Sequence, residues 1–494
     1  MKKIINFFKT HQIITLIITS FLLGVITVFI SSTVSSFLYD GYSAVEVVDS
    51  NFFYMLGKML HEGKTPYLEV FDHKGLYMFY YTFLGVALGG KVAFFFIQSI
   101  FMAVTYFFII RALLELQAHK SVIVFAVLIF LGIYAVSYYS PNDAEPQLPV
   151  SAVMVFFYAR AMRSENKKAY LLGNLFAGIL AGIAFNIRPS DMMVPFAFVL
   201  CYLVYAIKHK CFKDLLFNAL IAIGGLVVAL APAFIHAYSG GFLKEMFEAT
   251  LLNNFSYVGA AQKDPVIQWT ARAVVILVFG GYFAMLFINR KKLLGDEFIY
   301  FLVIGGVLFI LQLLIAYYTH YLLATFTVLF VFIPYLISKF FKEEKKWMLI
   351  PKITALLFAV ACSLVYPIKY YSQLKPATLE IVREVNLFVD ETSKKNGAVL
   401  CVDTNPGIYL AAGITPGYGD FSIQFNHVQV SKLYSYENYL EYLKSGKCKF
   451  VITEKNAAEG NKKTTSWFKS AEGLIYYAKI ESAELKLIDI YTYL

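Results

Sequence analysis

The stretch HQIITLIITSFLLGVITVFISSTVS, residues 11–35, decides the class of this protein, because it contains no charged residue beyond the histidine at its start. A helix that crosses a bilayer needs about 20 mostly apolar residues. Lysines precede the stretch, as they do in a secretory signal peptide, but the apolar run exceeds the ~7–15 residues of a signal peptide's apolar region. We therefore expect a first membrane span with its N-terminus in the cytoplasm.

Further apolar runs follow, and connectors rich in Lys and Arg alternate with connectors that have almost none. Positive connectors stay cytoplasmic. All the basic connectors fall on the cytoplasmic side only if one segment does not cross the bilayer. That segment is LYMFYYTFLGVALG, residues 76–89. This segment is too short for a span and is rich in Tyr and Phe, so we interpret it as an interfacial or re-entrant helix. The sequence thus predicts about 11 transmembrane helices. The later runs lie near residues 92–110, 121–138, 148–163, 169–187, 192–207, 214–237, 270–289, 297–316, 321–338 and 348–366.

The composition supports a membrane protein. Of 494 residues, 59% are hydrophobic and only 15% are charged, against about 25% charged in soluble domains. This excludes a cytosolic enzyme, a disordered chain and a coiled coil. The net charge of +10 would suggest nucleic acid only if it gathered in one patch. Most of the excess lies in the predicted cytoplasmic connectors, so we expect no nucleic-acid partner and a multi-pass protein of the cell (plasma) membrane.

Residues 369–494 differ in composition from residues 1–368. Their acidic and basic residues nearly balance, and helical pieces alternate with strand-like pieces such as AVLCVD and KCKFVITE. We therefore expect a polytopic α-helical module over 1–368 and a small C-terminal α/β extracytoplasmic domain over 369–494. The five cysteines form no CxxC pair and predict no zinc site. Cys401 and Cys448 either pair on the outer side or stay as thiols.

The unusual polar residues gather on the predicted outer face. In the first outer connector, Asp49 begins the segment DSNFFYMLGKMLHE, which has the pattern of an amphipathic helix lying along the membrane. Asp49 is either the N-cap of this helix or a functional carboxylate, and the two roles are compatible. The same connector contains Asp72, His73 and Lys74. A charged group at bilayer depth is costly, so each one invites a functional hypothesis.

Three later outer segments contain further candidates. Asp143 and Glu145 lie between two prolines, where a solvated turn is the alternative interpretation. Arg188, in NIRPSD, departs from the charge rule for outer connectors and has the forked donors that suit a phosphate. Its alternative is a simple ion pair with Asp191. His320 and Tyr321 lie at another outer edge, where a single His or Tyr is usually an interfacial anchor.

Carboxylates, a His–Lys pair and an Arg at the lipid–water boundary fit transfer to or from an anionic lipid. A carboxylate would be the general base on an acceptor hydroxyl, and cations would stabilise the phosphate that leaves. Two alternatives remain, a lipid or polysaccharide transporter (flippase) and a non-catalytic envelope-assembly protein. No charge interrupts the middle of several spans, as an ion relay would require, and this lowers the weight of the transporter hypothesis.

The stretch VDSNFFYMLGKMLHEGKTPYLEVFDHKG, residues 48–75, resembles the first outer loop of bacterial GT-C glycosyltransferases of the ArnT/PMT-like group (glycosyltransferase family 39 and relatives). These proteins have an acidic residue after the first span, a Gly-x-x-Pro-Tyr element and an Asp-x-Lys element. The segments SPNDAEPQLP, IRPSD and YTHYLL resemble later elements of the family more weakly. Leu76 stands where the family has a proline after Lys-Gly. The matching residues of the first loop are Gly63, Pro66, Tyr67, Asp72 and Lys74.

This resemblance implies a GT-C-like fold, a polyprenyl-phosphate-sugar donor and a catalytic aspartate, which corresponds to Asp49. Members generally need no nucleotide-sugar motif. Some use a divalent metal, for which this chain has carboxylates but no decisive ligand set. The acceptor would be an extracytoplasmic glycan or lipid, such as a polysaccharide, teichoic acid or glycolipid. We expect Arg188, Lys74 and His73 to hold the donor phosphate, Glu145, Asp143 and Asp72 to contact sugar hydroxyls, and His320 and Tyr321 to line the substrate site.

Overall fold

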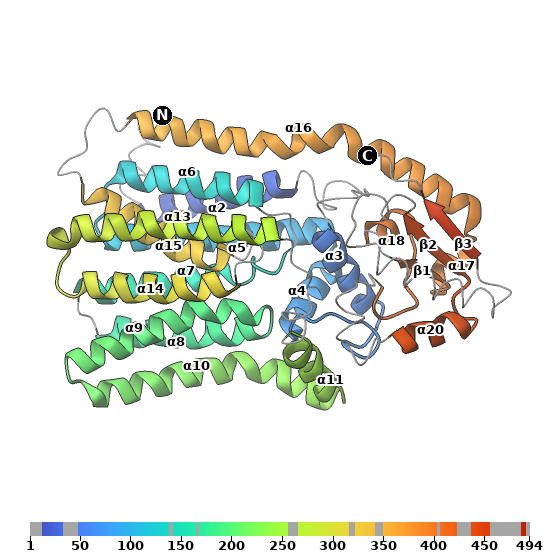
Figure 1. Cartoon of the computed structure of the whole chain (residues 1–494), viewed down its shortest axis with the longest axis horizontal. Coiled ribbons are helices and arrows are strands. Elements are labelled where there is room, and N and C mark those ends of the chain that lie inside the picture. Colours follow the sequence, from blue (N-terminus) through green and yellow to red (C-terminus); the bar gives the residue numbers. More distant parts are fainter. Residues whose placement is uncertain are drawn as a thin grey trace.

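A computed structural model describes residues 12–32, 48–137, 142–164, 167–254, 265–315, 322–340, 349–402, 406–421, 436–454 and 486–490. Long helices run side by side along the longest axis of the molecule and form a bundle (Figure 1). A small parallel sheet lies beyond one end of the bundle (Figure 1). Between the bundle and the sheet lie two short helices, α3 (Val48–His61) and α4 (Leu76–Ala87).

Within the described ranges, seven helical segments are long and apolar enough to cross a membrane. Four of the eleven predicted spans instead correspond to helices outside this set. These are α6 (Lys120–Ser137), α7 (Leu148–Ser164), α15 (Leu323–Ser338) and the start of α16 (Leu349–Phe388). The exact number of spans therefore stays a prediction. The seven are α2 (Gln12–Ser32), α5 (Lys91–Glu115), α8 (Lys167–Phe185), η1 (Pro189–Met192) with α9 (Met193–Lys208), α10 (Phe212–Ser239), α13 (Pro265–Asn289) with η3 (Arg290–Lys292), and α14 (Glu297–Ile315).

Small residues allow α8 and α10 to pack closely. A Cβ atom on Gly178 would lie 1.9 Å from the carbonyl oxygen of Ala222, so only glycine fits there. Gly182 follows four residues later, on the same side of α8. Close backbone approach through small residues spaced by four is typical of helix pairs in membranes, where lipid is as apolar as the side chains. The remaining helices enclose a core rich in Phe and Tyr, which includes Tyr106, Phe130 and Phe301.

The two ends of the bundle differ in charge. At one end, which we call the basic end, Lys208 and His209 form ion pairs with Asp296, and Arg163 lies 3.9 Å from Glu297. The connectors α6–α7 and α8–η1 lie at the opposite end, next to α3 and α4 (Figure 1). We call this the α3–α4 end. The grouping of connectors agrees with the alternation of basic and non-basic connectors in the sequence.

Helix α4 is too short to cross a bilayer. Its 12 residues extend about 18 Å at about 1.5 Å per residue, against a hydrocarbon thickness of about 30 Å. Helix α3 packs against α4, and its apolar side chains are buried inside the protein. The ring of Phe52 stacks on Phe421 with centroids 4.9 Å apart. The apolar face of α3 therefore contacts protein, where the sequence suggested a helix lying along the membrane.

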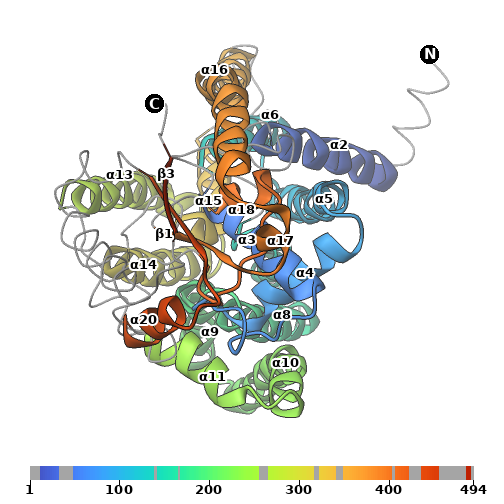
Figure 2. The same cartoon turned by 90° about the vertical axis from the view of Figure 1, so that its right-hand side faces the viewer.

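Helix α16 runs beside the bundle and continues without a break to the sheet (Figure 1). Its 40 residues include the junction expected between residues 368 and 369. The strands pair in parallel in the order β1-β2-β3, with Val399 opposite Phe450 and Phe450 opposite Lys486. Seen from this end, α18 lies next to α3 (Figure 2). All five cysteines are thiols. The elements after α16 are α17 (Glu391–Lys395), β1 (Val399–Val402), α18 (Gly407–Ala411), α20 (Tyr436–Lys444), β2 (Phe450–Glu454) and β3 (Lys486–Ile490).

Candidate active site

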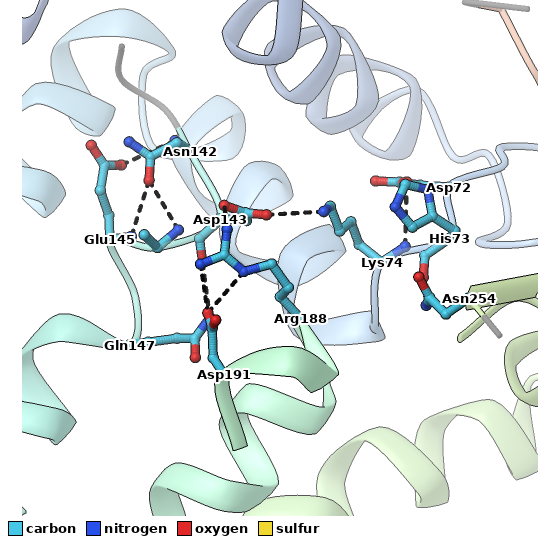
Figure 3. Close-up of polar contacts among 11 residues, drawn as sticks. Asp72, His73, Lys74, Asn142, Asp143, Glu145, Gln147, Arg188, Asp191 and Asn254 are labelled. Carbon is cyan, nitrogen blue, oxygen red and sulfur yellow. Dashed lines mark hydrogen bonds and ion pairs between the residues drawn. The ribbon is translucent and has the colours of Figure 1, made fainter. Parts of the chain in front are cut away.

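A cluster of ion-paired side chains joins three connectors at the α3–α4 end of the bundle (Figure 3). Lys74 precedes α4, Asp143 lies between α6 and α7, and Arg188 lies between α8 and η1. Lys74 Nζ is 2.9 Å from Asp143 Oδ2, and Arg188 Nη1 is 3.2 Å from Asp143 Oδ1. One carboxylate thus bridges two cations. The three side chains are 5–14% exposed, so water screens their interactions far less than it screens those of a surface ion pair.

A second carboxylate and an amide fix the orientation of Arg188. Arg188 Nε donates to Asp191 Oδ2 at 2.9 Å, and Gln147 Nε2 donates to the same oxygen at 2.9 Å. Because Pro189 follows, Arg188 adopts an extended backbone, with φ −145° and ψ 101°. The Arg188–Asp191 ion pair that the sequence offered as an alternative is therefore present. It positions the guanidinium beside Asp143.

A close backbone contact keeps Lys74 next to the Arg188 connector. The N–H of Tyr77 donates to the carbonyl oxygen of Asn186 at 3.1 Å. A Cβ atom on Gly75 would lie 2.2 Å from the carbonyl carbon of Asn186, so a larger residue would push the two connectors apart. The Lys-Gly pair of the sequence thus combines a cation with the only residue that allows this approach.

Asp49 lies in the first turn of α3, near enough to this cluster for the charges of Lys74, Asp143 and Arg188 to influence its pKa. The residue as a whole retains contact with solvent, and the protein around its carboxyl group has the largest influence on its pKa. Burial raises the pKa of Asp49, the positive charges of Lys74 and Arg188 lower it, and the negative charge of Asp143 raises it, with a net increase. The structure therefore places Asp49 within electrostatic reach of Lys74, Asp143 and Arg188, and its role as a catalytic carboxylate stays a prediction.

Asp72 and His73 lie on the side of Lys74 that is away from Asp143 (Figure 3). Asp72 Oδ1 is 3.2 Å from His73 Nδ1 and accepts a hydrogen bond from the N–H of Lys74 at 3.3 Å. Asn254 Nδ2 donates to the carbonyl oxygen of His73 at 2.9 Å. These contacts fix the conformation of the connector that contains Lys74. The hydrogen bond from the N–H of Lys74 to Asp72 is that of an Asx turn, in which an aspartate accepts from the backbone two residues later.

Glu145 points away from Asp143 and is fully buried (Figure 3). Its Oε1 accepts a hydrogen bond from Tyr134 at 2.9 Å and its Oε2 accepts one from Tyr81 at 2.8 Å. Gln98 Nε2 donates in turn to the hydroxyl of Tyr81 at 2.8 Å. These contacts tie the connector to α4, α5 and α6. They favour a structural role for Glu145 over the sugar contact that the sequence suggested.

We expect Glu145→Gln to destabilise the protein by about 1–3 kcal/mol, because one buried tyrosine hydroxyl would lose its acceptor. The midpoint of thermal unfolding in detergent would measure this change. A matched control is Glu297→Gln at the basic end, because Glu297 is also buried and accepts a hydrogen bond from Tyr335 at 2.7 Å. Glu297→Gln should lose less stability, because the one oxygen of glutamine is enough for its single tyrosine partner. A specific loss of sugar binding in Glu145→Gln alone would contradict the structural role.

His320 and Tyr321 lie outside the described residues, so their predicted substrate role stays a prediction. Sequence reasoning did not select Gln147, which contacts Asp191, or Tyr81, Gln98 and Tyr134 around Glu145. Neutral polar residues in apolar segments are the only sequence feature that could have indicated them. In the described part of the chain, no group of three His, Cys, Asp or Glu residues is placed to hold a metal ion.

The arrangement has the parts needed to move a group from a phosphate. Asp143 bridges two cations, and the carboxyl group of Asp49, whose pKa is raised, lies within electrostatic reach of both. Cations stabilise a departing phosphate, and a carboxylate with a raised pKa accepts a proton more readily than an ordinary one.

Residues 73–236 match the family model of dolichyl-phosphate-mannose-protein mannosyltransferase, a GT-C family. The match includes Lys74, Asp143 and Arg188, whereas Asp49 precedes it. It confirms the resemblance to ArnT/PMT-like GT-C enzymes, and it supports a membrane glycosyltransferase. No curated protein matches the chain.

Proposed function

We propose that this protein transfers a sugar from a polyprenyl-phosphate-linked donor to a cell-envelope acceptor on the extracytoplasmic side of the membrane. The observation that carries the proposal is the Lys74–Asp143–Arg188 cluster, with the carboxyl group of Asp49 within its electrostatic reach. The acceptor classes are a polysaccharide, a teichoic acid or a glycolipid. The family match supports the glycosyltransferase class, and the lipid-phosphate donor is part of the proposal.

In the proposed step, Asp49 takes the proton of an acceptor hydroxyl. The hydroxyl oxygen forms a bond to the anomeric carbon of the sugar while the bond from that carbon to the phosphate oxygen breaks. The polyprenyl phosphate leaves with the bonding electron pair, and the positive charges of Lys74 and Arg188 stabilise the negative charge that develops on it. Asp143 holds these two cations together, and Asp191 orients Arg188.

The proposal places the α3–α4 end of the bundle outside the cytoplasm and the basic end inside, because basic connectors remain cytoplasmic. It includes a multi-pass location in the cell membrane with about eleven spans. Residues 369–494 would be an extracytoplasmic α/β domain, supported by the parallel sheet beyond the α3–α4 end. The contact between Phe52 and Phe421 suggests that this domain supports the helix that carries Asp49.

The transfer rate should depend on pH through Asp49. Only the deprotonated carboxylate accepts a proton, so the rate should fall as the pH falls through its pKa. Because that pKa is raised, the fall should occur above pH 3.8, the value for an ordinary aspartate. Rate measurements from pH 4 upward would show this limb. The residual rate of Asp49→Asn should lack it, and an identical limb in that variant would assign the titration to another group.

The decisive experiment is transfer of a labelled sugar by the purified protein. A polyprenyl-phosphate sugar is supplied in detergent or vesicles with cell-envelope fractions as acceptor, and labelled product is measured together with released polyprenyl phosphate. Equal amounts of both products would support the proposal. Movement of intact labelled donor across vesicles without cleavage would overturn it in favour of a transporter. Absence of both, with intact envelope assembly in cells that express Asp49→Asn, would favour a non-catalytic component.

A further inference from the structure

Tyr67, in the connector between α3 and α4, has an unusual backbone for a bulky residue. Its φ is +62°, in the left-handed region that favours glycine. In the described part of the chain, two other non-glycine residues have a positive φ, Gln117 and Lys210, and both lie in connectors at the basic end. Residues held in such conformations cluster at functional sites. The tyrosine side chain must therefore make interactions that outweigh this strain.

Hydrogen bonds within the connector hold Tyr67 in this backbone conformation. The N–H of Tyr67 donates to the carbonyl oxygen of Val70 at 2.7 Å, and the N–H of Glu69 donates to that of Thr65 at 2.9 Å. The carboxylate of Glu69 accepts in turn from the N–H of Thr65 at 2.8 Å. These bonds close residues 65–70 into a compact loop, so the direction of the Tyr67 side chain is fixed by its own connector.

The side chain of Tyr67 is fully buried and joins this loop to three other segments. The centroid of its ring lies 4.8 Å from that of Phe79 in α4 and 6.1 Å from that of Phe242, which follows α10. Its hydroxyl donates to the carbonyl oxygen of Lys74 at 2.9 Å. Burial raises the pKa of Tyr67 well above its ordinary value, and the negative charge of Asp72 raises it further. The hydroxyl therefore keeps its proton and remains a donor.

Both backbone polar groups of Lys74 are consequently held in place. Its N–H donates to Asp72 Oδ1 at 3.3 Å, and its carbonyl oxygen accepts from Tyr67. From this backbone the side chain of Lys74 extends to Asp143, with Nζ 2.9 Å from Oδ2 (Figure 3). A lysine ammonium lies at the end of a flexible four-carbon stem. Its position therefore depends on how firmly the backbone at the base of that stem is held.

We propose that Tyr67 is a positioning residue for Lys74. Its hydroxyl holds the backbone of Lys74 where Nζ can reach the donor phosphate beside Arg188. This role rests on the proposed function, because Tyr67 acts through a cation that we assign to the phosphate. It also accounts for the strained backbone, since a glycine at position 67 would relieve the strain but could not make this hydrogen bond.

The test is Tyr67→Phe in the purified full-length protein, which keeps the buried ring and removes only the hydroxyl. With a labelled polyprenyl-phosphate sugar, kcat/KM for the donor should fall about five-fold, the equivalent of about one hydrogen bond. Tyr282→Phe is the matched control, because Tyr282 is also fully buried and donates to a carbonyl oxygen, that of Phe301, at 2.7 Å. Both variants should lower the midpoint of thermal unfolding, but Tyr282→Phe should leave kcat/KM unchanged.

A double-mutant cycle shows whether Tyr67 acts through Lys74. In a Lys74→Met background, Tyr67→Phe should have no further effect on kcat/KM for the donor, because the group that it positions is already absent. A five-fold fall that persists in this background would overturn the role. Unchanged donor kinetics in Tyr67→Phe, with transfer by the wild type, would overturn the role alone. Absence of transfer by the wild type would overturn the proposed function and the role together.

Discussion

Asp49→Asn should lower the rate of sugar transfer by about 100- to 10,000-fold, the contribution typical of a general base. Asparagine has nearly the same shape as aspartate but cannot take a proton from the acceptor hydroxyl. Lys74 and Arg188 lie near enough to this carboxyl group to influence its pKa. The substitution removes a negative charge beside these cations, so donor affinity should stay equal or increase. The loss should therefore appear in kcat.

Two comparisons make this result specific to Asp49. Glu62→Gln makes the same chemical change on an exposed carboxylate in the same connector and should leave transfer and folding unchanged. The elution profile in detergent and the midpoint of thermal unfolding should be the same for Asp49→Asn and the wild type. Full transfer activity in Asp49→Asn would exclude this carboxylate as the base, even though the family match would stand.

Arg188→Leu should have the second largest effect, because it damages both binding and stability. Loss of charge-assisted hydrogen bonds to the donor phosphate should raise the donor KM about 10- to 100-fold. The variant also leaves Asp143 and Asp191 buried without their common cation, which typically costs about 3–5 kcal/mol. Transfer kinetics over a range of donor concentrations and thermal unfolding would measure the two effects separately.

Arg163→Leu separates these effects, because Arg163 lies near the buried Glu297 at the basic end. It should lower stability without raising the donor KM. Arg188→Lys should fall between Arg188→Leu and the wild type, since lysine keeps the charge but lacks the planar fork. A normal donor KM in Arg188→Leu would show that this residue only supports the fold.

Much of the fold could be predicted because membrane segments follow local rules. Charge in short connectors indicated which of them share an end of the bundle, and the ion pairs of Lys208 and Arg163 agree with that grouping. The count of spans is harder, because α6, α7 and α15 have only 16–18 residues. Whether such a helix crosses the bilayer depends on its neighbours, which hydropathy alone does not describe.

The candidate site could be predicted only in part. Asp49, Lys74 and Arg188 stood out because charge is rare in such a chain. Glu145 looked equivalent to Asp143, two residues away, but the turn directs these side chains to opposite sides. No local pattern reveals that direction, since it depends on Tyr81 from α4 and Tyr134 from α6. A neutral residue such as Gln147 acquires its significance only from contacts between distant segments.

The continuous helix α16 has a consequence for how sequence length is constrained. A helix turns by about 100° for each residue, because it has about 3.6 residues per turn. Gaining or losing one residue between the bundle and the sheet would rotate the sheet about the helix axis by that angle. Phe421 would then no longer face Phe52. The number of residues in α16 therefore fixes the rotation of the sheet relative to the bundle. We expect this helix to tolerate substitutions far more readily than insertions or deletions.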